Sequence, residues 1–162
     1  MHFSTVTDEA GGAETGGTGW LLCRAGALLC ALPLPHVIET MRVLPAETVA
    51  GAPAYVRGLS MIRGAPTLVV DLAALVGGAA STPSRLVTVR TGARTVALAV
   101  DDVLGIRAFE PRSEAALPPL LREAAGELVE AIGRLDAELV LLLRTSRIVP
   151  DAPLPAHEEE VA

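Results

Sequence analysis

The sequence predicts a mainly β protein, built as small barrels or a sandwich. Apolar residues make up 51% of its 162 residues, and they occur in short runs. Fifteen glycines and 12 prolines separate these runs. Short apolar runs have the length of strands, and Gly and Pro mark the turns between them. The chain is also long enough to bury a substantial core, as one domain or two small subdomains.

The first predicted elements follow a segment rich in Gly, Thr and Glu. This segment, residues 1–19, is expected to form a flexible arm. Two apolar runs around Arg24-Ala25-Gly26 then predict a hairpin, and Pro35 is expected to open a helical turn. The strands expected in this part lie within 20–23, 27–30 and 41–44.

The stretch from Ala54 to Gly77 predicts a strand, a tight turn, a second strand and a short helix. Gly64 suits a backbone position with positive φ, so Arg63-Gly64 is expected to reverse the chain. Asp71 is typical of a helix N-cap, and a glycine pair provides the matching stop. Arg63 is therefore expected at a fixed turn, pointing away from the core.

The second half repeats this style after a small-residue segment, Gly78 to Ser84, which is expected to separate two halves. A glycine-containing loop predicts a hairpin, and side-chain alternation places Val96, Leu98 and Val100 on one face. The uninterrupted run Leu139 to Leu143 suits a strand buried on both faces. The strands expected here lie within 85–89, 95–100, 130–133 and 138–143, with a helical turn within 120–125.

Charge and composition exclude several classes of function. The formal net charge is −6, but residues 20–150 carry 12 acids and 13 arginines, so the acidic excess lies in the arm and in an acidic tail over 151–162. Without a basic stripe or many aromatic residues, a nucleic-acid partner is not expected. No apolar run is long enough to span or insert into a membrane, and no secretory signal is recognised, so we expect a cytoplasmic protein.

No catalytic or metal site can be assembled from the sequence. The chain contains no Lys, which excludes a Walker A loop and a catalytic lysine. Asp101 and Asp102 are adjacent, so their side chains would diverge on a strand. His36 lacks a nearby cluster of metal ligands, and Cys23 and Cys30 are expected to be reduced and buried. We therefore expect a binding module without cofactor or metal, and not an enzyme.

The segment Gly58-Leu59-Ser60-Met61-Ile62-Arg63-Gly64, followed by a strand ending in Asp71-Leu72, resembles the central signature of the CheW family. These proteins are adaptors that couple chemoreceptors to a histidine kinase. Val100-Asp101-Asp102-Val103 resembles a second family segment, and the resemblance covers most of residues 20–143. The chain departs from the family pattern at three positions, which are Met61, Leu68 and Arg144.

The resemblance implies two small five-stranded SH3-like β-barrel subdomains, packed side by side, with short helices. The expected domain spans residues 20–150. Its first subdomain is expected over about 32–82 and its second over about 84–135. The strands at 20–31 and 136–149 are expected to complete the barrels.

The resemblance also implies a receptor-binding groove lined by Leu34, Val37, Glu39 and Arg63. A guanidinium suits a carboxylate or helix-end carbonyls, and an apolar pair beside an acid could receive an amphipathic helix hairpin. The alternative for Arg63 is a solvated turn arginine with a weak local ion pair. The alternative for Leu34, Val37 and Glu39 is that the first two only close the barrel end while the acid is solvated.

The functional hypothesis is a non-enzymatic scaffold. Its implied partners are the regulatory domain of a CheA-type histidine kinase and the cytoplasmic tip of a methyl-accepting chemoreceptor, in arrays at the inner membrane. The departures leave open an auxiliary adaptor of a pilus-motility or developmental pathway. A small barrel enzyme or ligand carrier is a further alternative, and it would need a deep polar pocket with converging titratable groups.

Overall fold

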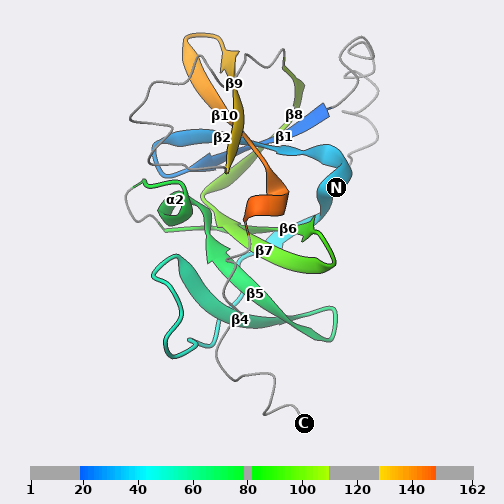
Figure 1. Cartoon of the computed structure of the whole chain (residues 1–162), viewed down its shortest axis with the longest axis vertical. Coiled ribbons are helices and arrows are strands. Elements are labelled where there is room, and N and C mark those ends of the chain that lie inside the picture. The colour runs from blue at the N-terminus through cyan, green and yellow to red at the C-terminus, as the bar shows by residue number, and fades with distance from the viewer. Residues whose placement is uncertain (1–18, 79–81, 110–127, 149–162) are drawn as a thin grey trace.

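The computed structural model describes residues 19–78, 82–109 and 128–148 (Figure 1). Most of this part is strand, as the short apolar runs predicted. The strands are β1 (Gly19–Ala25), β2 (Leu28–Pro33), β3 (Val37–Arg42), β4 (Val56–Ile62), β5 (Ala65–Asp71), β6 (Arg85–Thr91), β7 (Arg94–Val100), β8 (Asp102–Ala108), β9 (Val129–Leu135) and β10 (Glu138–Leu143). The short helices are the 3₁₀ turns η2 (Leu34–His36) and η4 (Thr145–Arg147) and the single α-helical turn α2 (Leu72–Leu75).

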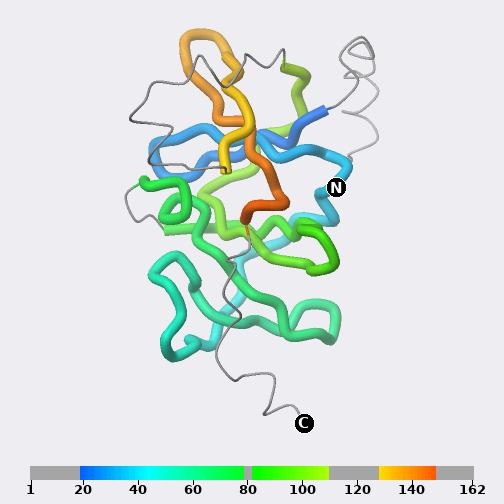
Figure 2. Tube along the Cα trace, in the orientation of Figure 1, coloured from blue at the N-terminus to red at the C-terminus, as the bar shows by residue number. Residues whose placement is uncertain are grey.

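The strands form two five-stranded sheets, which agrees with the predicted architecture. Sheet A has the order β8-β1-β2-β10-β9, and sheet B has the order β3-β6-β7-β5-β4. Each sheet is antiparallel apart from one parallel pair, β2–β10 in sheet A and β5–β7 in sheet B. Figure 2 shows that the first strands (blue) and the last strands (yellow to orange) of the described chain lie in the same half of the molecule, because β1, β2, β9 and β10 all belong to sheet A.

This topology corrects the expected internal boundaries. The hairpin β6–β7 falls within the range expected for the second subdomain, about 84–135, but it lies at the centre of sheet B. Its strands pair with β3 on one side and with β5 on the other. The chain therefore passes from sheet B to sheet A between β7 and β8, and not at Gly78 to Ser84. A small-residue segment marks a connection, but it does not say which strands the flanking residues will pair with.

Many strands are buried on both faces because the described residues form three apolar cores. One core draws its members only from sheet A, including Trp20 and Leu22. A second draws its members only from sheet B and adjoining residues, including Ala97 and Ala99. The third, which we call the seam core, joins the two sheets. Alternate residues of β7 show the division, because Val96, Leu98 and Val100 enter the seam core, as the alternation predicted.

The edges of sheet A approach each other through one aromatic contact. Phe109 follows β8, the first strand of the sheet, and Gly133 lies in β9, the last. A Cβ atom placed on Gly133 would lie 3.0 Å from the Phe109 ring. Because these strands are at opposite ends of the sheet order, this contact requires sheet A to curl. Gly133 leaves the space that the ring occupies.

The signature hairpin β4–β5 forms as predicted. Asp71 caps α2 by accepting a hydrogen bond from the Ala74 backbone N–H, at 3.3 Å. Gly58 has φ of +140°, and a Cβ atom there would lie 2.1 Å from the Glu47 carbonyl oxygen. Glu47 exchanges two backbone hydrogen bonds with Leu59, both 2.8 Å long. The glycine that opens the motif therefore permits a close approach of two backbones.

Other expectations meet the structure with small differences. The hairpins β1–β2, β6–β7 and β9–β10 are present, and Pro35 lies in the turn η2. The strand expected over 41–44 begins earlier, at Val37. Leu139 is 55% exposed, so only the later part of the run to Leu143 is buried. The arm, the acidic tail and the helical turn within 120–125 lie outside the described residues. In the described ranges, no helix has the length and apolar character to cross a membrane.

Candidate functional site: the charged pair at the mouth of sheet B

Arg63 occupies a strained turn that holds it away from the core. The turn joins β4 to β5, and both of its central residues have positive φ, 55° at Arg63 and 77° at Gly64. Positive φ at both central residues is the pattern of a type I′ hairpin turn, whose twist matches the flanking strands. The Arg63 side chain is 77% exposed. The expectation of an exposed guanidinium at a fixed turn is therefore confirmed.

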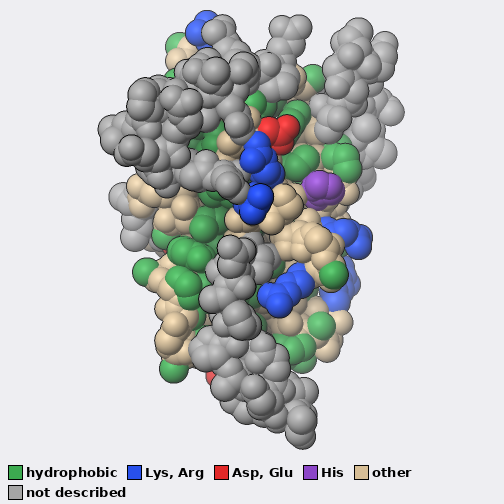
Figure 3. Space-filling view, in the orientation of Figure 1, with side chains coloured by type: hydrophobic (Ala, Val, Ile, Leu, Met, Phe, Trp, Pro, Cys, Tyr) green, Lys and Arg blue, Asp and Glu red, His purple; other side chains and the backbone are tan. Residues whose placement is uncertain are grey.

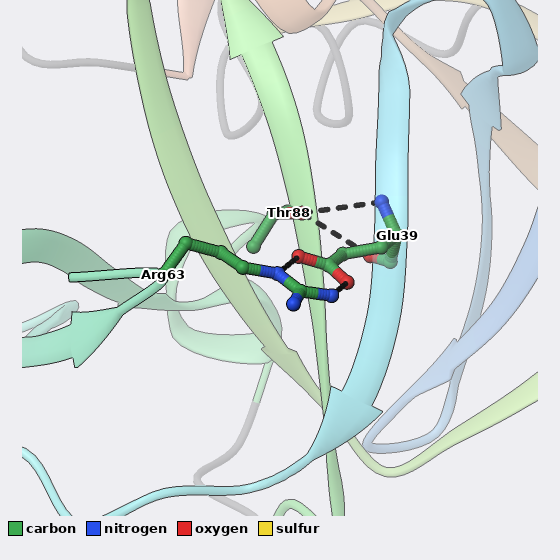
Figure 4. A network of polar contacts seen from close by, with 3 residues as sticks. All are labelled: Glu39, Arg63 and Thr88. Carbon is green, nitrogen blue, oxygen red and sulfur yellow. Dashed lines mark hydrogen bonds and ion pairs between the residues drawn. The ribbon is translucent and has the colours of Figure 1, made fainter. Parts of the chain in front are cut away.

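The partner of this arginine is Glu39, which comes from the opposite end of the same sheet. Arg63 donates from Nε to Glu39 Oε2 at 2.9 Å and from Nη2 to Oε1, so the pair is bidentate (Figure 4). Glu39 lies in β3 and Arg63 follows β4, the two end strands of sheet B. The ion pair thus bridges the two edges of the curled sheet. The alternative for Arg63 was a turn arginine with a local ion pair, and such a pair is present. Its acid is Glu39, which is also the other charged residue predicted for the receptor-binding groove.

Thr88 fixes the backbone that carries Glu39. Its hydroxyl accepts from the Glu39 N–H at 3.2 Å and donates to the Glu39 carbonyl at 3.3 Å. A register shift between Val37 and Glu39 interrupts the β3–β6 ladder at this point. The buried hydroxyl of Thr88, which is 1% exposed, joins the strands across the irregularity. Sequence reasoning missed Thr88, because a threonine within an apolar strand gives no sign of its partner.

The ion pair shifts the pKa of both side chains in the direction that keeps each of them charged. Hydrogen bonding to Arg63 lowers the pKa of Glu39 below its ordinary value of 4.5, against a smaller opposing effect of desolvation. The same hydrogen bond raises the pKa of Arg63. A carboxylate with a lowered pKa stabilises the folded chain above its ordinary pKa and loses that contribution as the pH falls through the lowered value. The pair is therefore intact at neutral pH.

The two apolar residues predicted for the groove lie elsewhere around β3. Leu34 in η2 and Val37 at the start of β3 are both partly buried, and both pack against the seam core. Residues two apart on a regular strand share a face, but the register shift between Val37 and Glu39 breaks that relation. Of the four predicted groove residues, Glu39 and Arg63 therefore contact each other directly. Leu34 and Val37 lie instead against the seam core, where the two sheets meet.

A separate hollow of about 460 Å³ lies along β4. It is lined by Pro45, Ala46, Glu47, Leu59, Ser60, Met61 and Pro66. Ser60 donates a hydrogen bond to the Pro45 carbonyl at 2.6 Å, which holds the preceding segment against the hairpin. Met61, one of the departures from the family pattern, is 65% exposed. Glu47 is the one titratable residue of this lining, so the hollow does not gather the converging polar groups that the enzyme alternative requires.

Basic side chains on the face shown in Figure 3 lie in separate small groups. The ion pairs within the described ranges join Arg24 to Glu138, Arg57 to Asp71 and Arg63 to Glu39. Each of these three arginines has its own carboxylate.

Comparisons with known proteins agree with this fold. A CheW-like domain model matches residues 19–152. The chemotaxis protein CheW of Rhizobium meliloti (strain 1021) is 25% identical over 160 residues, which cover 97% of this chain and 100% of that protein. The crystal structure of the scaffolding protein TtCheW from Thermoanaerobacter tengcongensis is similar with a TM-score of 0.66 at 20% identity, over 78% of this chain and 88% of that one. From the match over residues 19–152, the chain belongs to the CheW-like domain family.

Proposed function

We propose that the chain is a non-enzymatic scaffold that couples chemoreceptors to a CheA-type histidine kinase. The family relationship supports this role, since the similar proteins are described as a chemotaxis protein and a scaffolding protein. The observation that carries the proposal is the exposed guanidinium of Arg63. It is held in one orientation by the carboxylate of Glu39, which comes from the opposite end strand of sheet B.

The bidentate pair leaves part of the guanidinium available. Arg63 uses Nε and Nη2 for Glu39. A guanidinium carries five N–H donors, so Nη1 and the remaining N–H of Nη2 can still bind an acceptor. Helix-end carbonyls or a carboxylate on the cytoplasmic tip of a chemoreceptor would supply that acceptor. The ion pair reduces the side-chain freedom that binding would otherwise have to remove.

In this proposal, Leu34, Val37, Glu39 and Arg63 border the surface that receives the receptor hairpin. The partly buried Leu34 and Val37 would contact its apolar face, and the charged pair would fix its register. The kinase regulatory domain would pair with an exposed β surface near the end of a sheet. The scaffold would transmit a signal by coupling two binding events in fixed geometry, in arrays at the inner membrane.

A charge exchange at the pair separates a binding role from a structural one. We expect Arg63→Ala to weaken binding to the receptor by about tenfold or more, because charge-assisted hydrogen bonds to the receptor are lost. The unfolding temperature should stay nearly unchanged, because an exposed ion pair contributes little to stability. The double variant Arg63→Glu with Glu39→Arg restores an ion pair but presents the opposite arrangement of charge. We expect this variant to fold normally and to bind the receptor poorly. Recovery of full receptor affinity by the double variant, measured by calorimetry, would show that the pair acts only on the fold.

A further inference from the structure

A second pair of arginines lies in sheet B, and its members face each other without a carboxylate. Arg42, the last residue of β3, is directly opposite Arg85, the first residue of β6. Val43 donates a backbone hydrogen bond to the Ser84 carbonyl at 3.2 Å, so the neighbouring pair is of the non-hydrogen-bonded type. Pairs of this type bring opposite side chains closest together, about 4.5 Å between Cα atoms. Both arginines are exposed, on one face of the sheet.

The described residues provide neither arginine with an ion-pair partner. Ion pairs among these residues involve Arg24, Arg57 and Arg63, and none involves Arg42 or Arg85. Glu39 lies three residues before Arg42, on the opposite face of β3, and is already bound by Arg63. Like charges directly opposite each other destabilise a sheet. In the free protein, Arg42 and Arg85 therefore repel each other. An anionic group bound beside them would attract both and offset this repulsion.

The backbone edge of β3 beside Arg42 has no ladder partner among the described strands. β3 is an end strand of sheet B and pairs only with β6 among the described strands. Because Val43 points its N–H toward β6, the alternation of the ladder directs the Arg42 backbone groups to the other edge. Leu44, next but one along the chain, is 36% exposed. An open strand edge with free N–H and C=O groups can accept another strand.

We propose that this edge binds an extended acidic segment of a protein partner, which adds a strand to sheet B and places a carboxylate beside Arg42. The inference rests on the proposed scaffold function, which requires protein partners. A row of carboxylate, Arg42 and Arg85 would then cross three neighbouring strands. A peptide satisfies both the charges and the open backbone edge, whereas a free phosphate would satisfy the charges alone.

The substitution Arg42→Glu separates binding from folding because the two effects have opposite signs. In the free protein it replaces a repulsion with an attraction to Arg85, so the unfolding temperature should stay equal or rise. In the complex it places an acid against an acidic strand, so affinity should fall by about tenfold or more. Arg90→Glu is the matched control, since Arg90 is exposed, lies on β6 with Arg85, and is opposite Thr95.

Calorimetry would use the purified receptor cytoplasmic fragment and the kinase regulatory domain of the same organism, each tested separately. The inference predicts that Arg42→Glu weakens one of them while Arg90→Glu does not. Unchanged affinity of Arg42→Glu for both, or equal weakening by both variants, would overturn it. If the wild-type chain binds neither protein, the scaffold function fails as well.

A second measurement tests the remaining candidate, the acidic segment 151–162 of the chain itself. The inference predicts that Arg42→Glu does not lower the unfolding temperature, with or without that segment. Suppose instead that Arg42→Glu lowers the unfolding temperature of the full chain but not of a chain that lacks residues 151–162. The arginines would then bind the acidic residues of that segment, and the proposal would be overturned.

Discussion

The most specific prediction concerns Gly58, where the backbone of β4 approaches another segment closely. In Gly58→Ala, the new methyl group would lie 2.1 Å from the Glu47 carbonyl oxygen. That oxygen belongs to the backbone and accepts from the Leu59 N–H at 2.8 Å, so it cannot move aside without breaking the bridge between Glu47 and Leu59. The substitution also forces alanine to adopt φ of +140°.

The magnitude follows from these two effects. Alanine in a sparsely populated backbone region costs about 1–3 kcal/mol. Loss of the two hydrogen bonds between Glu47 and Leu59 adds about 1 kcal/mol for each. We therefore expect Gly58→Ala to lower the free energy of unfolding by about 3–5 kcal/mol. For a chain of this size, that loss corresponds to a fall of about 6–20 °C in the unfolding temperature.

Gly64→Ala provides the matched control in the same hairpin. Gly64 also has positive φ, +77°, but a Cβ atom there would have nothing within 4 Å. It should therefore show only the backbone cost, about 1–2 kcal/mol. Urea denaturation of the wild type and both variants measures the difference. Equal destabilisation by the two substitutions would refute the claim that the close approach to Glu47 is what requires glycine at position 58.

Two further predictions concern the cores. Gly133→Ala should destabilise the chain and change the near-ultraviolet circular dichroism of Phe109, because the new methyl group would lie 3.0 Å from the ring; an unchanged unfolding midpoint would contradict the contact. Cys23 and Cys30 should resist alkylation in the folded protein, because burial raises the pKa of both thiols, to about 12 at Cys30. Their labelling rate should rise only when the chain unfolds, and rapid labelling of the native protein at neutral pH would refute the burial.

Local signals in the sequence predicted the local structure well. Gly64 marked the turn, Asp71 marked the start of α2, and the alternation in β7 gave the face that enters the seam core. Each of these features depends on residues close in the chain, where φ preferences, capping and alternation act directly. The short apolar runs indicated strands for the same reason.

Features that depend on distant pairing were only partly accessible. Membership of β6 and β7 in sheet B depends on their pairing with β3 and β5, which no local pattern specifies. The pair between Glu39 and Arg63 joins residues 24 apart, at opposite ends of a sheet. The family resemblance placed both residues in one groove, but the direct ion pair and the support from Thr88 required the folded chain.

Cosedimentation tests the scaffold claim most directly. Membranes or vesicles carrying the chemoreceptor would be mixed with the histidine kinase, with and without this chain, and pelleted. A scaffold that binds both proteins predicts that the kinase pellets with the receptor only when the chain is present, and that Arg63→Ala reduces the amount. Kinase that pellets equally without the chain, or a chain that binds just one of the two proteins, would contradict the account.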